Sequence, residues 1–148
     1  MVQVDLVRDK IRRLRDTLAA LLRTLPGDPG PLARERDALD LVSFRVYLAM
    51  QEAIDLCSHV IADEGWGPAP SLREHFTILA TRGVLAAELA RELASGVKIR
   101  NLIGHAYAEI DPAQLHAAAR RLPELLEAFC AQTLAFAESR VAGGPDVS

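Results

Sequence analysis

The sequence predicts an all-α protein, folded as a single bundle of about five helices. Two observations carry this prediction: apolar residues recur at alternating steps of three and four, and runs of proline and glycine separate the segments with this spacing. Steps of three and four place residues on one face of an α-helix. No segment alternates apolar and polar residues as a half-buried strand does, and no internal repeat is visible. The chain has 148 residues, 50% of them hydrophobic, which suits one domain with a buried core.

The first expected helix ends at a run of proline and glycine residues. Its apolar seam runs over three heptads and consists of Val4, Val7, Ile11, Leu14, Leu18, Leu21 and Leu25. Residues 26–31, PGDPGP, end it because proline cannot continue a helix and disfavours helical geometry in the residue before it. A second helix is expected over residues 32–63, with the same spacing from Leu39 to Val60. Two seams of similar length joined by a short turn predict an antiparallel pair.

Shorter helices are expected in the middle of the chain. A helix over residues 71–81 should begin at Ser71, because Ser71 and Glu74 have the spacing of a capping box. Another amphipathic helix is expected over residues 84–94, and the Ser-Gly pair that follows is expected to end it.

The last expected helix is long. Asp111 should be its N-cap and Pro112 occupies the tolerated first position, while Pro123 is expected to kink it. The domain is therefore expected to cover residues 1–141, and the Gly- and Pro-containing end, residues 142–148, is expected to be a flexible tail.

The composition and charge of the chain limit the classes of protein to which it can belong. There is no stretch of eighteen apolar residues, so no membrane span is expected, and residues 1–5 lack the pattern of a signal peptide. Cys57 and Cys130 are isolated on apolar helical patterns, which favours buried free thiols and a cytoplasmic protein.

The net charge is −3 and the pI is near 5.8, so a global basic signature for nucleic acid is missing. The densest basic run, from Arg8 to Arg15, is interpreted as a solvated helix face.

The candidate catalytic and phosphate-binding side chains lie close together in residues 98–107, KIRNLIGHAY. Arg100 is a permanent cation with a planar donor fork suited to phosphate. His105 can move a proton near neutral pH, and Tyr107 offers a phenol. Such a set can bind a phosphodiester and transfer protons around it. The plainer alternative is a helix end at which Arg100 forms a surface ion pair while His105 and Tyr107 pack.

This stretch resembles the signature of the HepT-like toxins of the HEPN group. Arg100 and Asn101, with His105 and Tyr107 in an Arg-x4-His-x-Tyr pattern, carry the likeness, which extends over about residues 40–135. Further similar stretches are residues 51–56, 83–90 and 109–112. The resemblance implies a HEPN-like helical bundle that forms a homodimer with facing motifs. It also implies a metal-independent ribonuclease.

The resemblance implies a role for each residue of the motif. Arg100 and His105 are the expected catalytic groups: Arg100 binds the phosphate of an RNA substrate and His105 transfers protons. Asn101 and Tyr107 support them, with Asn101 orienting the backbone or the scissile group. The implied partner is a minimal nucleotidyltransferase, the antitoxin of a type VII-like toxin–antitoxin pair. It transfers AMP to Tyr107 and silences the toxin, and the added phosphate is expected beside Arg100. No cofactor, metal ion, DNA or membrane is expected to take part.

Helix geometry limits what one chain can do with this motif. At 100° per residue, Tyr107 returns to within about 20° of Arg100, whereas His105 lies about 140° away. The helix is therefore expected to loosen near Gly104, or a second chain is expected to complete the site. RNA cleavage without a metal needs a base, an acid and a cation. One chain offers a single histidine and a single arginine here, and a two-fold dimer supplies two of each.

Two other functions stay open. The acidic net charge and the lack of a basic face near the motif fit a non-catalytic HEPN-type module that binds a nucleotide or a partner protein. The third possibility is a structural bundle in which the motif only stabilises a dimer.

The polar residues outside the motif have plainer explanations. Glu52, Asp55 and His59 form a solvated stripe or, less simply, the lining of a groove or interface. His75 is expected to be structural or exposed, and His116 to lie at the surface. The Cys-x-His pair that ends at His59 has no second pair at metal-ligand spacing.

Overall fold

The structure, a computed structural model, describes residues 2–143 and confirms the all-α prediction. These residues form six α-helices and one short 3₁₀ helix, and they contain no strand. The elements are α1 (Val4–Thr24), α2 (Gly30–Arg34), α3 (Arg36–Glu64), α4 (Leu72–Thr81), α5 (Ala87–His105), η1 (Tyr107–Glu109) and α6 (Pro112–Ala142). Most of the tail expected at residues 142–148 lies outside the described residues.

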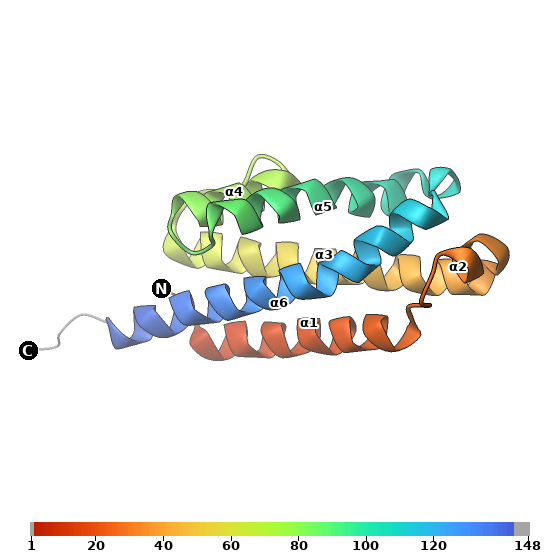
Figure 1. The fold of residues 1–148 in the computed structure, drawn as a ribbon. Helices are drawn as coiled ribbons and strands as arrows, with labels where there is room; N and C mark the ends of the chain where they lie inside the picture. The colour runs from red at the N-terminus through yellow and green to blue at the C-terminus, as the bar shows by residue number, and fades with distance from the viewer. Residues whose placement is uncertain (1, 144–148) are drawn as a thin grey trace, which may run out of the picture.

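Helix α3 is the centre of the bundle. It packs against each of the other five α-helices, and Figure 1 shows α1 and α5 on opposite sides of it. Its buried face includes Val46, Ala49 and Ala53, each fully shielded from solvent. The seam expected for the first helix is buried at Val7, Ile11, Leu14, Leu18 and Leu21, as its spacing predicts. Among the described residues, no helix has the length and apolar character needed to cross a membrane.

Two expected helix boundaries are wrong. The helix predicted over residues 32–63 is two helices, because Glu35 has an extended backbone with φ −118° and ψ 113° between α2 and α3. The helix predicted over residues 84–94 begins at Ala87 and continues to His105, through the Ser-Gly pair expected to end it. A Cβ on Gly96 would lie 3.5 Å from the sulfur of Met50. This glycine therefore faces α3 at close range within an unbroken helix.

The predicted capping residues are confirmed. The Oγ of Ser71 accepts a hydrogen bond from the backbone N–H of Glu74 at 3.3 Å. Asp111 accepts one from the N–H of Ala113 at 3.0 Å and so caps α6. Helix α6 continues through Pro123, and in Figure 1 its ribbon changes direction partway along.

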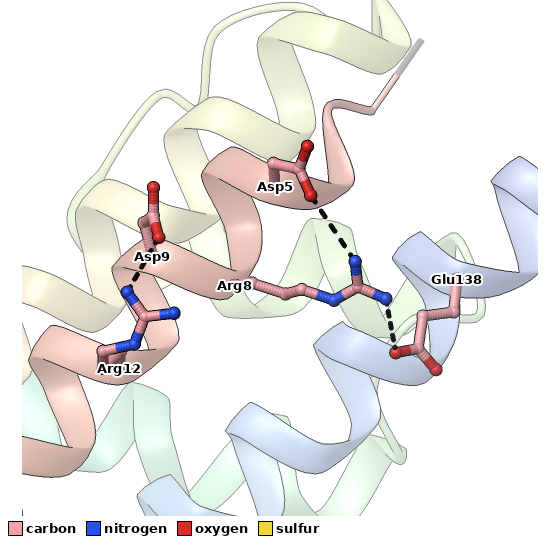
Figure 2. Close-up of polar contacts among 5 residues, drawn as sticks. All are labelled: Asp5, Arg8, Asp9, Arg12 and Glu138. Atoms are coloured by element: carbon pink, nitrogen blue, oxygen red, sulfur yellow. Dashed lines mark hydrogen bonds and ion pairs between the residues drawn. The ribbon is translucent and has the colours of Figure 1, made fainter.

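Three arginines of the basic run on α1 pair with nearby carboxylates. Figure 2 shows Arg8 between Asp5 of its own helix and Glu138 of α6, with distances of 3.5 and 3.2 Å. Arg12 pairs with Asp9 at 3.0 Å, also in Figure 2, and Arg15 pairs with a glutamate of α6 at 2.7 Å. Exposed pairs of this kind contribute about 0–1 kcal/mol each. Arg8 and Arg15 therefore link α1 to α6 at the surface, whereas the pair of Arg12 lies within α1.

The isolated cysteines and histidines have structural environments. Cys57 and Cys130 are both buried and free, and burial raises the pKa of the Cys130 thiol to about 12. His75 is half-buried and shares a hydrogen bond of 2.9 Å with the hydroxyl of Ser58, as a structural residue should. The expectation that His116 lies at the surface is wrong. Its side chain is 5% exposed, and its Nε2 is 2.7 Å from the carbonyl of Pro26, which ties α6 to the end of α1.

Candidate functional site

The motif lies at the end of α5 and faces the first half of α3. Helix α5 stays regular through Gly104 and ends at His105, after which Ala106 leaves helical geometry with φ −142° and ψ 49°. The expected loosening near Gly104 is therefore displaced by two residues. Gly104 has another role, because a Cβ there would lie 3.2 Å from Cε2 of Tyr47. Its lack of a side chain allows the Tyr47 ring to approach α5.

Arg100 is held by three oxygen acceptors. Its guanidinium donates to the phenol oxygen of Tyr47 at 3.0 Å and to Oε1 of Gln51 at 2.7 Å. It also donates to Oδ1 of Asn101 at 3.1 Å, so Asn101 orients this guanidinium. The guanidinium carbon lies 4.7 Å from the centroid of the Tyr47 ring, within cation–π range. We call Arg100, Asn101, Tyr47 and Gln51 the arginine cluster.

None of the acceptors in the arginine cluster carries a charge. Among residues 2–143, no ion pair joins Arg100 to a carboxylate, and its Nε is buried without a hydrogen-bond partner. Asp55 acts only indirectly, because it accepts from the amide of Gln51 at 3.0 Å. Charge-assisted hydrogen bonds to phosphate are stronger than those to neutral acceptors. The cluster therefore presents an oriented, half-buried cation that still lacks an anion.

Tyr107 has different partners. Its hydroxyl donates a hydrogen bond to Oδ1 of Asp40 on α3. The same oxygen is 3.0 Å from Nε of Arg36, whose guanidinium carbon lies 5.2 Å from the Tyr107 ring centroid. Burial, and then the bond to Asp40, raise the pKa of the Tyr107 phenol. We call Tyr107, Asp40 and Arg36 the tyrosine cluster.

His105 stands apart from both clusters. Its side chain is exposed, and it makes no hydrogen bond to any described residue. The structure brings Arg100 and Tyr107 to different places on α3, since their partners Tyr47 and Asp40 are seven residues apart, which is about 10 Å along a helix. Within one chain, therefore, the four motif residues do not converge on one point.

An exposed aromatic residue lies between the clusters. Phe44 is four residues after Asp40 and three before Tyr47, so all three share one face of α3. Its side chain is 60% exposed, and Leu41 beside it is 40% exposed. This apolar face separates the tyrosine cluster from the arginine cluster along the same helix.

Four residues of the two clusters are not identified as site residues by the motif in the sequence. They are Arg36, Asp40, Tyr47 and Gln51. Their spacings of four, seven and four place them along one face of a helix, and this periodicity is visible in the sequence. The pattern does not, however, tell which of them will face α5. Gln51 opens one of the stretches on which the family resemblance was based.

The polar stripe on α3 is partly a groove lining. Glu52 and Asp55 line a groove of about 440 Å³ with Lys10 and Arg13 of α1. Glu52 also accepts a hydrogen bond from the hydroxyl of a threonine on α1 at 2.5 Å. His59 is exposed and does not line this groove.

Metal-ligand groups do not gather in the part of the chain that the structure describes. No three His, Cys, Asp or Glu side chains there lie close enough together to hold a metal ion. Cys57 is buried while His59 is exposed, so this Cys-x-His pair does not form a joint ligand site.

The chain is similar to known proteins in sequence and in fold. The model of the family described as Ribonuclease HepT-like matches residues 14–132. The mRNA nuclease HepT of Shewanella oneidensis is 23% identical over 107 residues, which cover 72% of this chain and 80% of that protein.

Two solved structures show the same fold. One is a crystal structure of a toxin–antitoxin with AMP-PNP, with a TM-score of 0.81 and 21% identity over 88% of this chain and 98% of that chain. The other is the tri-AMPylated HEPN toxin of Shewanella oneidensis in complex with the MNT antitoxin. Its TM-score is 0.80, with 21% identity over 91% of this chain and 99% of that chain.

Proposed function

The chain belongs to the HepT-like ribonuclease family, and from that premise we propose that it is the RNA endonuclease of a toxin–antitoxin pair. A partner nucleotidyltransferase silences it by transferring AMP to Tyr107. The observation that carries the proposal is the charge of the arginine cluster. Arg100 is fixed by neutral acceptors and has no carboxylate partner among the described residues, so a backbone phosphate of RNA can complete its coordination.

The proposed reaction needs no metal ion. The ribose 2′-hydroxyl attacks the adjacent phosphorus, the bond to the 5′-oxygen breaks, and the products are a 2′,3′-cyclic phosphate and a free 5′-hydroxyl. His105 transfers protons in this step, and Arg100 stabilises the charge that develops on the phosphate. The exposure of His105 and its lack of an internal hydrogen bond leave its ring nitrogens available to RNA. Asn101 contributes by orienting Arg100.

The proposed active form is a homodimer. One chain supplies one histidine and one arginine to the motif, and the two groups do not converge within it. A two-fold axis beside α3 doubles both groups and brings His105 of one protomer toward Arg100 of its partner. The exposed Phe44 and Leu41 lie between the clusters and support this face as the dimer contact, because burial of such side chains stabilises association.

Neutralisation is proposed to act at Tyr107. The HEPN toxin of similar fold that is tri-AMPylated in complex with the MNT antitoxin supports this modification. From the sequence, the added phosphate is expected to lie beside Arg100. The cation found at Tyr107 is Arg36 instead, so Arg36 is the guanidinium that the AMP phosphate meets first.

The proposal is tested with the purified chain, single-stranded RNA and EDTA. We expect cleavage that leaves 2′,3′-cyclic phosphate ends, and a loss of about 10² or more in rate for His105→Ala. His59→Ala is the matched control, because His59 is also exposed and lies on α3 away from the motif. Wild-type RNA binding without cleavage would favour the non-catalytic module, and a His105→Ala variant as fast as wild type would remove the catalytic assignment.

Modification is followed by intact mass with the cognate nucleotidyltransferase and ATP. Wild type is expected to gain AMP and lose its cleavage activity, whereas Tyr107→Phe gains none. AMP that remains undiminished in Tyr107→Phe would place the modification elsewhere.

A further inference from the structure

The two tyrosines of the chain have opposite hydrogen-bond roles. The Tyr47 oxygen accepts a hydrogen bond from Arg100, whereas the Tyr107 hydroxyl donates its proton to the carboxylate of Asp40. A phenol that donates its hydrogen bond to a carboxylate is arranged as a nucleophile next to a base. Tyr47 lacks this arrangement, and its ring is packed against Gly104.

Asp40 is accessible and held in place. Its side chain is 49% exposed, and Arg36, one turn earlier on α3, fixes Oδ1 at 3.0 Å. Tyr107 is the first residue of η1, so the break in α5 at Ala106 places its hydroxyl on this oxygen. Asp40 therefore contacts the reacting oxygen atom of Tyr107 and is open to a second protein that carries a nucleotide.

We propose that Asp40 is the general base that accepts the phenolic proton of Tyr107 during AMP transfer, and that Arg36 binds the transferred phosphate. This inference rests on the proposed function, in which Tyr107 is the acceptor. The Tyr107 oxygen attacks the α-phosphorus of ATP and forms the new O–P bond. The bond from the α-phosphorus to the oxygen of the β-phosphate breaks, and pyrophosphate leaves with its electrons. The proton passes to the Asp40 carboxylate and then to solvent.

The environment of the phenol explains why a base is needed. Burial and the bond to Asp40 raise the pKa of Tyr107, so the phenolate fraction at neutral pH is very small. A carboxylate in hydrogen-bond contact removes the proton as the O–P bond forms, without free phenolate.

Charge explains the role of Arg36. After transfer, the phosphodiester on Tyr107 is a second anion beside Asp40. Repulsion between the two anions destabilises the phosphodiester at this place. Arg36 already contacts the other two residues of the tyrosine cluster, Asp40 and Tyr107. It can therefore exchange Asp40 for the phosphate oxygens and form a charge-assisted pair. Arg36 acts here as a positioning residue.

The test compares Asp40→Asn with Asp37→Asn. Asp37 lies one turn earlier on the same helix, is exposed, and has no hydrogen-bond or ion-pair partner for its side chain among residues 2–143, so its substitution removes the same charge without touching Tyr107. The measurement is the initial rate of transfer from α-labelled ATP to the full chain by the cognate nucleotidyltransferase, from pH 6 to pH 10.

At pH 7 we expect Asp40→Asn to slow transfer by about 10² or more, and Asp37→Asn to remain near wild type. The deficit of Asp40→Asn should shrink as the pH rises, because hydroxide then supplies the phenolate. Arg36→Gln should lower the rate without changing the shape of the pH profile, and Arg36→Lys should restore part of it.

Two results would overturn the role of Asp40, and a third would overturn the role of Arg36. The first is transfer to Asp40→Asn at the wild-type rate at pH 7. The second is a deficit of Asp40→Asn that is the same at every pH, since a merely structural role gives that profile. The third is transfer to Arg36→Gln at the wild-type rate, which would rule out the role of Arg36 but leave that of Asp40. If wild type takes no AMP, or Tyr107→Phe takes as much as wild type, the proposed modification itself fails, and the inference fails with it.

Discussion

The arginine cluster and the tyrosine cluster use the same helix and similar residues, yet their charges differ. Each pairs an arginine of one element with a tyrosine ring of another at cation–π distance, 4.7 Å in the first and 5.2 Å in the second. In the tyrosine cluster the arginine is neutralised by Asp40, whereas in the arginine cluster the acceptors are the uncharged oxygens of Tyr47, Gln51 and Asn101. The charge of the acceptor therefore decides whether a fixed arginine is neutralised within the chain, as Arg36 is, or keeps its full charge, as Arg100 does.

The largest expected effect comes from removing the uncompensated arginine. Arg100→Ala should lower RNA cleavage by a factor of about 10² to 10⁴, because the guanidinium stabilises charge that develops in the transition state. Arg121→Ala is the control, since Arg121 is exposed and already paired with Glu92 at 3.0 Å. Single-turnover cleavage rates check the comparison, and equal losses in the two variants would contradict it.

The face between the clusters should control association. The wild type is expected to have twice the 16.1 kDa mass of one chain at micromolar concentration. Phe44→Asp should give monomers, because it places a charge at the centre of the proposed contact. Leu22→Asp is the control, since Leu22 is 58% exposed, close to the 60% of Phe44, but lies on α1. Light scattering measures the masses, and a Phe44→Asp dimer would place the contact on another face.

The tyrosine cluster should be visible in the alkaline titration of the chain. The folded pKa of Tyr107 is raised, so its contribution to stability is present below the ordinary pKa near 10 and is lost as the pH rises through the folded pKa. Absorbance at the phenolate band should show Tyr107 titrating above pH 10, and Asp40→Asn should lower its pKa toward 10. A Tyr107 titration unchanged by Asp40→Asn would show that burial alone sets this pKa.

The smallest expected effect concerns the close approach of α5 to Tyr47. Gly104→Ala should displace the Tyr47 ring by a few tenths of an ångström and reduce cleavage by about threefold, a loss near 0.7 kcal/mol in transition-state stabilisation. In Gly96→Ala the new methyl group meets Met50 at ordinary contact distance, 3.5 Å, and cleavage should not change. Both substitutions replace a glycine of α5 with the better helix former alanine, so cleavage rates separate the contact with Tyr47 from helix propensity.

The sequence predicted the fold well because the apolar spacing is dense and the caps are local. The seam of α1 and the caps at Ser71 and Asp111 depend only on residues within one or two turns. The break at Glu35 and the continuity of α5 through Gly96 depend on packing between helices, which spacing along one segment does not contain.

The candidate site was predicted only as a list of side chains. Arg100, Asn101, His105 and Tyr107 were identified from their chemistry and from the family resemblance, but their distribution over two clusters was not. That distribution depends on Tyr47 and Asp40, which are more than fifty residues away along the chain. Which face of α3 meets α5 is a property of the whole bundle.

We propose that Arg100 binds RNA phosphate because no carboxylate among residues 2–143 neutralises it. Gln51→Glu tests this most directly, since it replaces the neutral acceptor at 2.7 Å with a carboxylate of nearly the same shape and converts the cluster into an ion pair. Gln114→Glu, on the exposed surface of α6, is the control for the added charge. We expect about a tenfold or greater loss of cleavage in Gln51→Glu, with folding stability kept, and cleavage close to wild type in Gln114→Glu. Wild-type cleavage by Gln51→Glu would contradict it.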